Sequence, residues 1–165
     1  MTQSQELSAI ARSIIDSNLY MVIGTADETG VPWVSPVYYS PVRYTEFYWI
    51  SSPGARHSHN LTVRPQVNIV IFDSRAPVGT GQAVYLSAVA EKLAGADLDQ
   101  GIASYNARFA NPDERGVRVI KPEELSPPAI YRLYRATASE YWILDPTPGR
   151  TGDHRIRISL QAGPA

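Results

Sequence analysis

The chain has 165 residues, of which 44% are hydrophobic and 19% charged, so it has the composition of one globular domain rather than of a disordered or fibrous protein. Its net charge of −1 excludes a broadly basic surface and argues against nucleic-acid or anionic-membrane partners. It contains no cysteine, which excludes disulfides, thiol nucleophiles and cysteine-ligated metal or iron–sulfur sites.

The first 17 residues predict an N-terminal helical segment. Apolar residues from Leu7 to Ile15 recur at helical spacing, which predicts a helix over residues 4–17 with Ser4 as its cap. The segment lacks the basic start and apolar centre of a secretory leader, and no later window reaches ~18 uninterrupted apolar residues. We therefore expect one cytoplasmic domain over residues 1–165, with a frayed tail at 161–165.

Six or more strands are predicted after this helix. Strand-like runs, separated by turn signals, cover residues 19–26, 31–39, 47–51, 66–72, 82–93, 117–120, 130–136, 139–144 and 155–160. Helical segments interrupt them at 55–63 and, as an insertion, at 97–110. Because short turns join most strands, we predict a mainly β domain of the α+β class, an antiparallel barrel with short flanking helices. Pro32 and Pro36 place the second strand at a sheet edge.

One turn between a strand and a helix carries candidate chemistry. The strand ends in Ser51 and Ser52, a Pro-Gly pair turns the chain, and a helix begins near Ala55 with Arg56 and His57 in its first turn. The unpaired N–H groups of a helix start favour an anion, arginine is a bidentate phosphate donor, and serines supply hydroxyls. The turn is thus a candidate phosphate site. A serine-rich turn with Arg56 and His57 in solvent is the alternative that this stretch leaves open.

The order of motifs along the chain resembles the pyridoxamine 5'-phosphate oxidase-like family of FMN-binding split barrels. The flavin-binding segment of that family is matched by residues 47–72, which read FYWISSPGARHSHNLTVRPQVNIVIF. Further stretches in family order lie at 24–39, 82–91 and 140–157, so the resemblance spans about residues 19–158. It implies a six-stranded antiparallel split β-barrel that binds FMN at the interface of a homodimer.

Matched position by position, the resemblance implies three kinds of cofactor-binding residue. The first kind lines the isoalloxazine ring, partly through backbone groups, or reaches its edge: Ser35, Val37, Tyr38 and Gln82. The second kind lies at the ribityl phosphate: Ser51, Ser52, Arg56 and His57, with Ile50 in the same set. The third kind comes from the partner subunit: Trp142 and Arg155. The implied activity is transfer of hydride or electrons between flavin and NADH, NADPH or a small organic substrate. No side chain is singled out as catalytic, because the flavin carries the chemistry.

Two departures from the family pattern bear on function. His57 stands where the family often has lysine, and we expect a phosphate partner to raise the pKa of His57, so that FMN affinity weakens as the pH climbs from about 6 to 8. Near the C-terminus, Arg157 replaces a histidine and the basic substrate-binding segment of true pyridoxamine phosphate oxidases does not follow. This argues against vitamin B6 oxidation and favours a general flavin reductase or oxidase.

Two alternatives remain open. A deazaflavin in the same groove would favour further cations after Arg56, where residues 58–60 are Ser-His-Asn. A non-catalytic flavin-binding or sensing protein would have the same sequence pattern as an enzyme. We predict no metal site at His57, His59 and His154, because an i, i+2 pair diverges on a helix and no carboxylate cluster completes the set.

Overall fold

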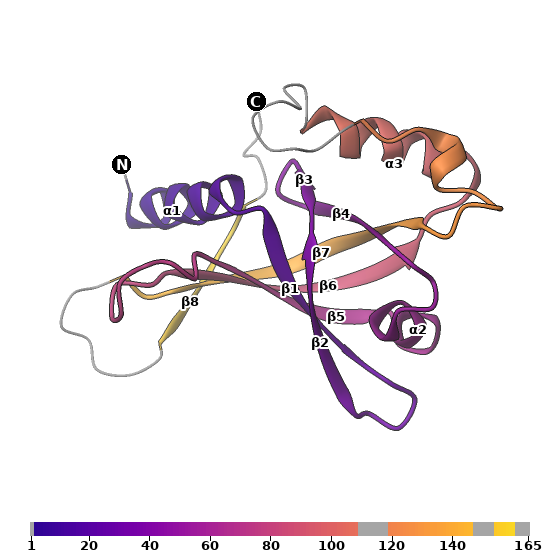
Figure 1. The fold of residues 1–165 in the computed structure, drawn as a ribbon. Coiled ribbons are helices and arrows are strands. Elements are labelled where there is room, and N and C mark those ends of the chain that lie inside the picture. The colour runs from indigo at the N-terminus through magenta and orange to yellow at the C-terminus, as the bar shows by residue number, and fades with distance from the viewer. Residues whose placement is uncertain (1, 109–118, 147–153, 161–165) are drawn as a thin grey trace.

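The strands form one antiparallel sheet in the computed structural model, which describes residues 2–108, 119–146 and 154–160 (Figure 1). The strands are β1 (Tyr20–Ala26), β2 (Pro32–Tyr38), β3 (Ser40–Val42), β4 (Glu46–Ser51), β5 (Gln66–Phe72), β6 (Ala83–Lys92), β7 (Arg132–Leu144) and β8 (Arg155–Ile158). The helices are α1 (Gln3–Ser17), α2 (Arg56–Val63) and α3 (Gly95–Ala107), with a 3-10 turn, η2, at Pro122–Glu124. The strand order is β2-β1-β5-β6-β7-β4-β3, and β8 pairs with β7. The predicted class, a mainly antiparallel split barrel with flanking helices, is confirmed.

The sheet has eight strands rather than the predicted six. Strand β3 was not predicted, because three residues are too few for an alternating pattern to show. The two runs predicted at 130–136 and 139–144 are a single strand, β7, and a register shift opposite Ser87 and Ala88 of β6 interrupts its alternation.

Two smaller expectations also change. The cap of α1 is Thr2 rather than Ser4, and its side chain forms a capping box with Gln5. Residues 119–120 of the predicted strand 117–120 are not in a strand. The remainder of that prediction, the last two residues of the inserted helical segment and the tail at 161–165 lie outside the described residues.

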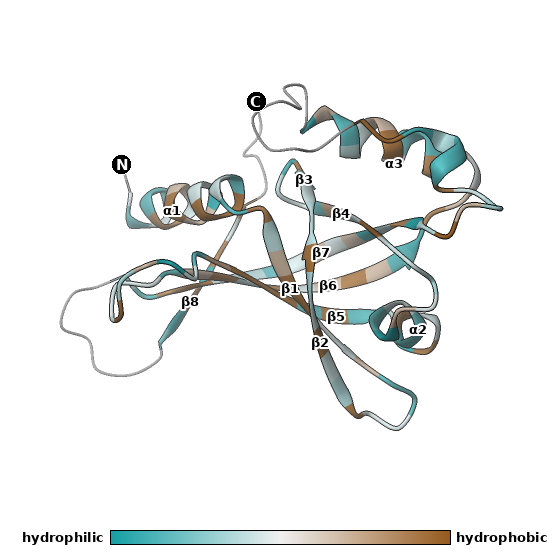
Figure 2. Ribbon diagram, in the orientation of Figure 1, coloured by the Kyte–Doolittle hydropathy of each residue, from teal (hydrophilic) through white to brown (hydrophobic). Residues whose placement is uncertain are grey.

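The main core lies on the inner face of the sheet and under α1. Alternation along β1 buries Met21 and Ile23 and leaves Val22 only half-buried, as expected for a strand with one face toward the core. Helix α1 packs its buried stripe, which includes Ala11 and Ile15, against the same core. Figure 2 shows that α2 is largely hydrophilic, in contrast to the mixed colouring of the strands. Among the described residues, no helix is long and apolar enough to cross a membrane.

Helix α3 covers a second apolar cluster at the β4 and β7 side of the sheet. Ile102 and Tyr105 pack there with Tyr48 and Leu133. The helix lies close to the strands because residue 101 is glycine: a Cβ there would lie 2.5 Å from Leu93 Cδ1. The cluster therefore depends on a close approach of α3 to the sheet.

The barrel is split between β2 and β4, which lie at opposite ends of the hydrogen-bonded strand order apart from the short β3. The edge position predicted for β2 from its prolines is confirmed, because β1 is its one neighbour in that order. The sheet curls so that the two strands approach each other beside α2, where a side chain of α2 contacts both of them.

Arg108, at the C-terminal end of α3, ties this helix to α1 and to the end of β2. Its guanidinium donates hydrogen bonds to the carbonyl oxygens of Tyr39 at 2.7 Å and Asn18 at 2.9 Å, with longer contacts to Ile15 and Asp16 at 3.4 Å. It also stacks 4.7 Å from the centre of the Tyr39 ring. One planar cation thus satisfies carbonyl groups from two separate segments.

We predict that Arg108→Lys lowers the free energy of unfolding by about 1–3 kcal/mol, because an ammonium cannot reach these carbonyls together or stack on the ring. Urea denaturation measures the change. Arg75→Lys, at a side chain that is 91% exposed, is the matched control and should leave the midpoint unchanged. Equal losses in the two variants would contradict the role of Arg108.

Candidate functional site

The turn before α2 presents an open helix start. Ser52 shapes this turn: its carbonyl oxygen accepts from Ala55 N–H at 3.0 Å, and its hydroxyl oxygen accepts from Gly54 N–H at 3.2 Å. The helix begins at Arg56, with Ala55 as its N-cap, and no side chain caps it. Its first turn contains no acidic residue. The N–H groups and positive dipole end are therefore available to an anion, as predicted for a phosphate site.

His57 points into the molecule rather than toward solvent. The residue is 8% exposed, and its Nε2 atom lies 2.7 Å from Ser51 Oγ at the end of β4. Its Nδ1 atom lies 3.1 Å from Ser35 Oγ on β2. The imidazole thus links the two strands that border the split in the barrel. The sequence predicted all three residues in one site but not this bridge.

Burial lowers the pKa of His57, since desolvation disfavours the imidazolium form. This direction is opposite to the rise that we expected from a phosphate partner, and both ring nitrogens contact serine hydroxyls. The expected rise concerns the phosphate-bound protein, so it stays a prediction. The direct contact of His57 with a cofactor also stays a prediction.

We call the turn and helix start at residues 51–57 the corner, and Arg56 is its exposed cation. Its guanidinium carbon lies 4.6 Å from the centre of the Trp33 ring, and Nη2 lies 3.9 Å from the Asp27 carboxylate. Hydrogen bonds from the Thr29 side chain and the Val31 N–H lower the pKa of Asp27, so this carboxylate is ionised at neutral pH. The half-exposed Arg56 side chain is therefore held over β2 by an aromatic face and an anion.

The β1–β2 turn is attached to α2 at a second point. Arg64, the residue after α2, donates from Nε to the carbonyl oxygen of Asp27 at 2.9 Å and from Nη2 to that of Glu28 at 3.3 Å. Sequence reasoning did not identify Trp33, Asp27 or Arg64 as part of this region. Their contacts join segments that are some 30 residues apart, and no local pattern reports such contacts.

The residues predicted beside the isoalloxazine ring differ in accessibility. Val37 is buried in the main core. Tyr38 and Ile50 are half-buried and pack at the border of the second cluster, and Tyr38 meets Tyr20 edge to face at 5.8 Å. Together with Ser35 and Ser51, these side chains belong to the region that borders the split.

Gln82, Trp142 and Arg155 lie at the opposite end of the sheet. Trp142 is opposite Tyr85 in the β6–β7 register, and the Arg155 guanidinium lies 4.4 Å from the centre of the Tyr85 ring. Ser51, in contrast, pairs with Arg132 at the start of β7. Ten residues separate Arg132 from Trp142, which is about 33 Å of extended strand. One chain therefore does not bring its own Trp142 to its own Ser51.

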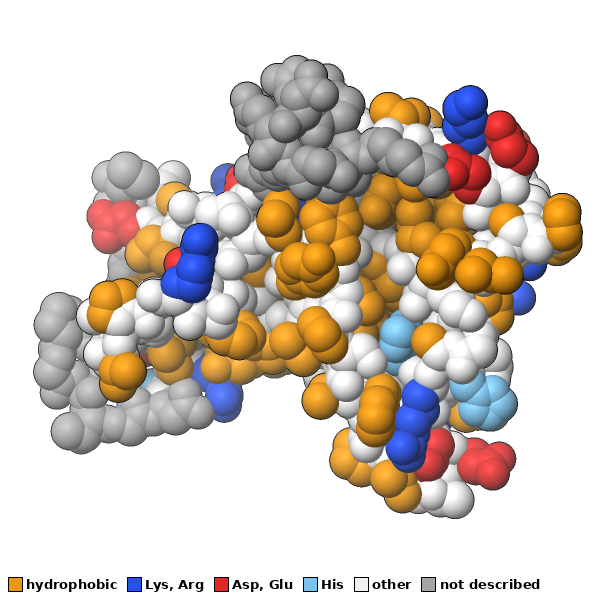
Figure 3. Space-filling view, viewed as in Figure 1, with side chains coloured by type: hydrophobic (Ala, Val, Ile, Leu, Met, Phe, Trp, Pro, Cys, Tyr) orange, Lys and Arg blue, Asp and Glu red, His pale blue; other side chains and the backbone are white. Residues whose placement is uncertain are grey.

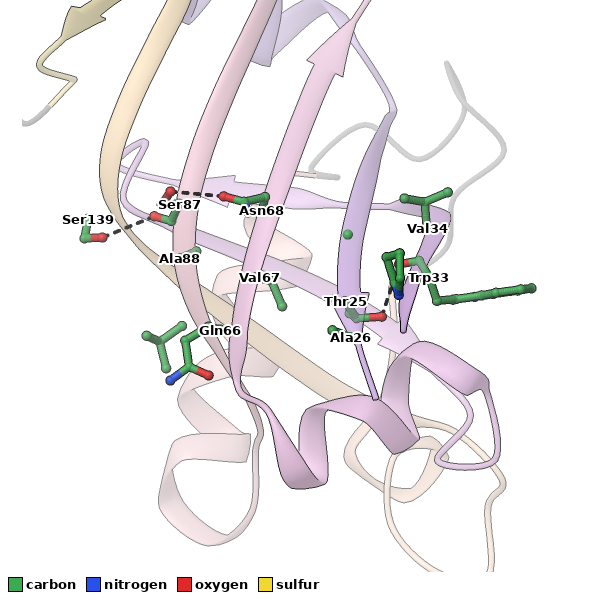
Figure 4. Close-up of a pocket in the computed structure, with 13 residues that line it drawn as sticks. Thr25, Ala26, Trp33, Val34, Gln66, Val67, Asn68, Ser87, Ala88 and Ser139 are labelled. Carbon is green, nitrogen blue, oxygen red and sulfur yellow. Dashed lines mark hydrogen bonds between the residues drawn. The ribbon is translucent and has the colours of Figure 1, made fainter. Parts of the chain in front are cut away.

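A hollow of about 560 Å³ lies on the outer face of β1, β2, β5 and β6 (Figure 4). Trp33 and Val34 border it on β2, and a polar strip crosses its other side, where Ser87 Oγ donates to Asn68 Oδ1 at 3.0 Å. None of the predicted cofactor-binding residues lines it. Trp33 is shared, because it borders the hollow and also contacts Arg56. Within the described ranges, no group of three or more His, Asp or Glu side chains is placed to hold a metal ion.

We predict that protonation of His57 destabilises the fold. Its pKa in the folded chain lies below the value of about 6.5 for an exposed histidine, so the unfolded chain binds the proton more tightly. The stabilisation that neutral His57 contributes is fully present above about pH 7. It is lost as the pH falls through 6.5 toward the pKa of His57 in the folded chain. Urea midpoints between about pH 7.5 and 5 should therefore decrease more steeply for the wild type than for His57→Gln. His59→Gln, at an exposed position of the same helix, should follow the wild type. Parallel curves for all three proteins would contradict the prediction.

Solved structures share this fold at low sequence identity. A heme binding protein from Mycobacterium smegmatis is 20% identical with a TM-score of 0.68, over 97% of this chain and 60% of that one. HutZ, the heme storage protein from Vibrio cholerae, is 21% identical with a TM-score of 0.61, over 81% and 90% of the two chains. An F420 reductase is 13% identical with a TM-score of 0.56, over 79% and 94%. The chain thus spans 60% of the length of the mycobacterial protein.

No curated protein sequence matches the chain. The family model described as pyridoxamine 5'-phosphate oxidase matches residues 7–138, which extend from α1 into β7 and include the whole corner around α2. The match covers most of the chain, and the fold agrees with it. The chain belongs to the pyridoxamine 5'-phosphate oxidase-like family.

Proposed function

We propose that the chain binds FMN as a homodimer and transfers hydride or electrons between the flavin and NADH, NADPH or a small organic substrate. One observation carries the proposal: the start of α2 is uncapped and free of acidic residues in its first turn, with Arg56 and the hydroxyls of Ser51 and Ser52 around it. Backbone N–H groups, a guanidinium and hydroxyls are the donors that a phosphate monoester requires.

These residues fit the phosphate end of FMN, and their neighbours fit its ring. Arg56 is half-exposed and able to form a bidentate contact, while Ser51 and Ser52 offer hydroxyls at the end of β4. Tyr38 and Ile50 supply a half-buried apolar wall beside them. When bound, the flavin supplies the redox chemistry, and the chain's residues bind and orient it. Figure 3 shows hydrophobic side chains gathered in the hollowed region between α3 and the β1–β2 hairpin.

Asp27 sets a limit on how tightly an anion binds at this corner. Its carboxylate lies 3.9 Å from Arg56, so a phosphate competes with it for the guanidinium. The pair is solvent-accessible, at 48% and 28% of the two side chains, and solvent-exposed ion pairs are worth little. A dianionic phosphate that also receives the α2 N–H groups therefore outcompetes one carboxylate.

A second copy of the chain explains why the predicted site residues fall into two distant groups. Gln82, Trp142 and Arg155 reach the corner if they come from a partner. The outer face of the sheet supports such pairing, because a row of outward apolar side chains runs in register across four strands: Val22, Val70, Tyr85 and Trp142.

The alternatives are disfavoured by particular residues. A deazaflavin would favour additional cations on α2, but Ser58 and Asn60 are buried there and only His59 faces solvent in that stretch. Two structural neighbours are heme proteins by name, yet both ring nitrogens of His57 contact serines. It offers no free nitrogen to an iron ion. A flavin-storing role differs from enzymatic turnover in one respect, the oxidation of NADH or NADPH by the FMN-loaded protein.

We predict that the protein binds added FMN with the visible spectrum of oxidised flavin, and that Arg56→Ala weakens FMN about 10–100-fold, the range expected for a charge-assisted hydrogen bond. Riboflavin, which lacks the phosphate, should bind both proteins alike. Fluorescence titration measures the affinities, and Arg75→Ala is the control. Equal affinity of the wild type for FMN and riboflavin, or an absorption band of bound haem in place of flavin, would overturn the proposal.

We predict that each site combines the corner of one protomer with Trp142 of its partner. Arg56→Ala and Trp142→Ala homodimers should both bind FMN weakly, whereas a mixed dimer of the two variants should regain one site of wild-type affinity. Two different affinity tags isolate the mixed dimer, and titration gives the number of tight sites. If both residues served the same site from the same chain, the mixed dimer would have no tight site.

A further inference from the structure

Four side chains form a continuous hydrogen-bonded chain across the split in the barrel. Trp33 Nε1 lies 3.0 Å from Ser35 Oγ, Ser35 Oγ lies 3.1 Å from His57 Nδ1, and His57 Nε2 lies 2.7 Å from Ser51 Oγ. The residues come from β2, α2 and β4. Among the described residues, neither serine hydroxyl has a further partner.

The tryptophan at one end sets the polarity of this chain. An indole N–H is a donor only, so Ser35 Oγ accepts from Trp33. A neutral imidazole donates from one nitrogen and accepts at the other. The four hydrogen-bonded side chains therefore have two possible arrangements of their protons. These arrangements differ in the nitrogen of His57 that carries the proton.

In the first arrangement, the Ser35 hydroxyl donates to Nδ1, and Nε2–H of His57 donates to Ser51 Oγ. All three bonds then run in the same direction, and each bond strengthens the next by polarisation. In the second arrangement, Nδ1–H donates to Ser35, where it meets the indole donor at one oxygen. Two donors then converge on Ser35, its own proton has no acceptor among the described residues, and the cooperative polarisation is lost.

We propose that Trp33 is a positioning residue that fixes His57 as the Nε2–H tautomer and thereby turns the Ser51 hydroxyl proton outward, as a donor to an anionic oxygen at the start of α2. The identity of that anion rests on the proposed function. The same indole holds Arg56 on its face at 4.6 Å. Trp33 thus orients both the cation and the hydroxyl donor of the corner, one through its ring and the other through its N–H group.

The arrangement of protons is measurable without any ligand. Ring ¹⁵N chemical shifts of the unliganded, histidine-labelled protein, recorded well above the histidine pKa of about 6.5, distinguish the two neutral tautomers. His57→Gln assigns the His57 signals, and the exposed His59 and His154 are internal controls.

We expect His57 to be the Nε2–H tautomer in the wild type. Trp33→Phe keeps an aromatic face for Arg56 but removes the N–H, and it should shift His57 toward a mixture of tautomers while the two controls stay unchanged. Trp33 is 40% exposed, so the variant should fold. Ser35→Ala is the second variant. It removes the hydroxyl between Trp33 and His57 and so interrupts the same series of hydrogen bonds. An Nδ1–H tautomer in the wild type, or a tautomer that neither variant alters, would overturn the proposal.

A double-mutant cycle then tests the effect at Ser51. Trp33→Phe should lower FMN affinity about 3–10-fold when Ser51 is present. It should have no effect in the Ser51→Ala background, because the hydrogen-bonded series of side chains then ends without a hydroxyl to orient. Riboflavin affinity should be the same throughout. An equal loss in both backgrounds would overturn the proposal. If the wild type binds no FMN, the proposed function fails, and the tautomer measurement alone tests whether Trp33 fixes the tautomer of His57.

Discussion

The imidazole of His57 bridges β2 and β4, the two strands that border the split in the barrel. No backbone ladder joins β2 to β4 in the described part of the chain, so the barrel depends on side chains where it is split. His57 supplies two hydrogen bonds there, one to each strand, from a helix that begins immediately after β4. A buried polar group is stabilising when its partners are in place and costly when they are not. The corner is therefore positioned by the same contact that closes the barrel.

His57 and Arg56 have different roles at this site. A buried, neutral His57 is suited to orienting hydroxyls, whereas Arg56 keeps its charge and is half-exposed. Arg56 lies over an aromatic ring and near a carboxylate, which restricts its position while leaving it accessible. In the proposed site, the electrostatic attraction for an anion comes from one arginine and the backbone of α2, and its geometry comes from the neighbours of His57.

Family membership and the two distant groups of site residues point to the same architecture. The family model spans α1 to β7, and the solved relatives reproduce the fold at 13–21% identity. At that level of identity the ligand of a relative does not transfer, since heme proteins and a reductase share one scaffold. The ligand must be argued from the site itself. The open helix start and the outward apolar row are the observations behind our proposal of a phosphate-bearing cofactor between two copies of the chain.

Local features of the protein were predictable from the sequence. Alternating apolar residues identified most strands, Pro32 and Pro36 placed β2 at an edge, and a strand-turn-helix pattern indicated a candidate anion site, because each of these depends on residues close together in the chain. Motif order along the chain identified the family. The tertiary structure decided which side chains meet: that His57 turns inward to two serines, that Trp33 lies under Arg56, and that Trp142 lies far from Ser51. Those facts depend on the curl and register of the sheet, which long-range packing sets and no local pattern encodes.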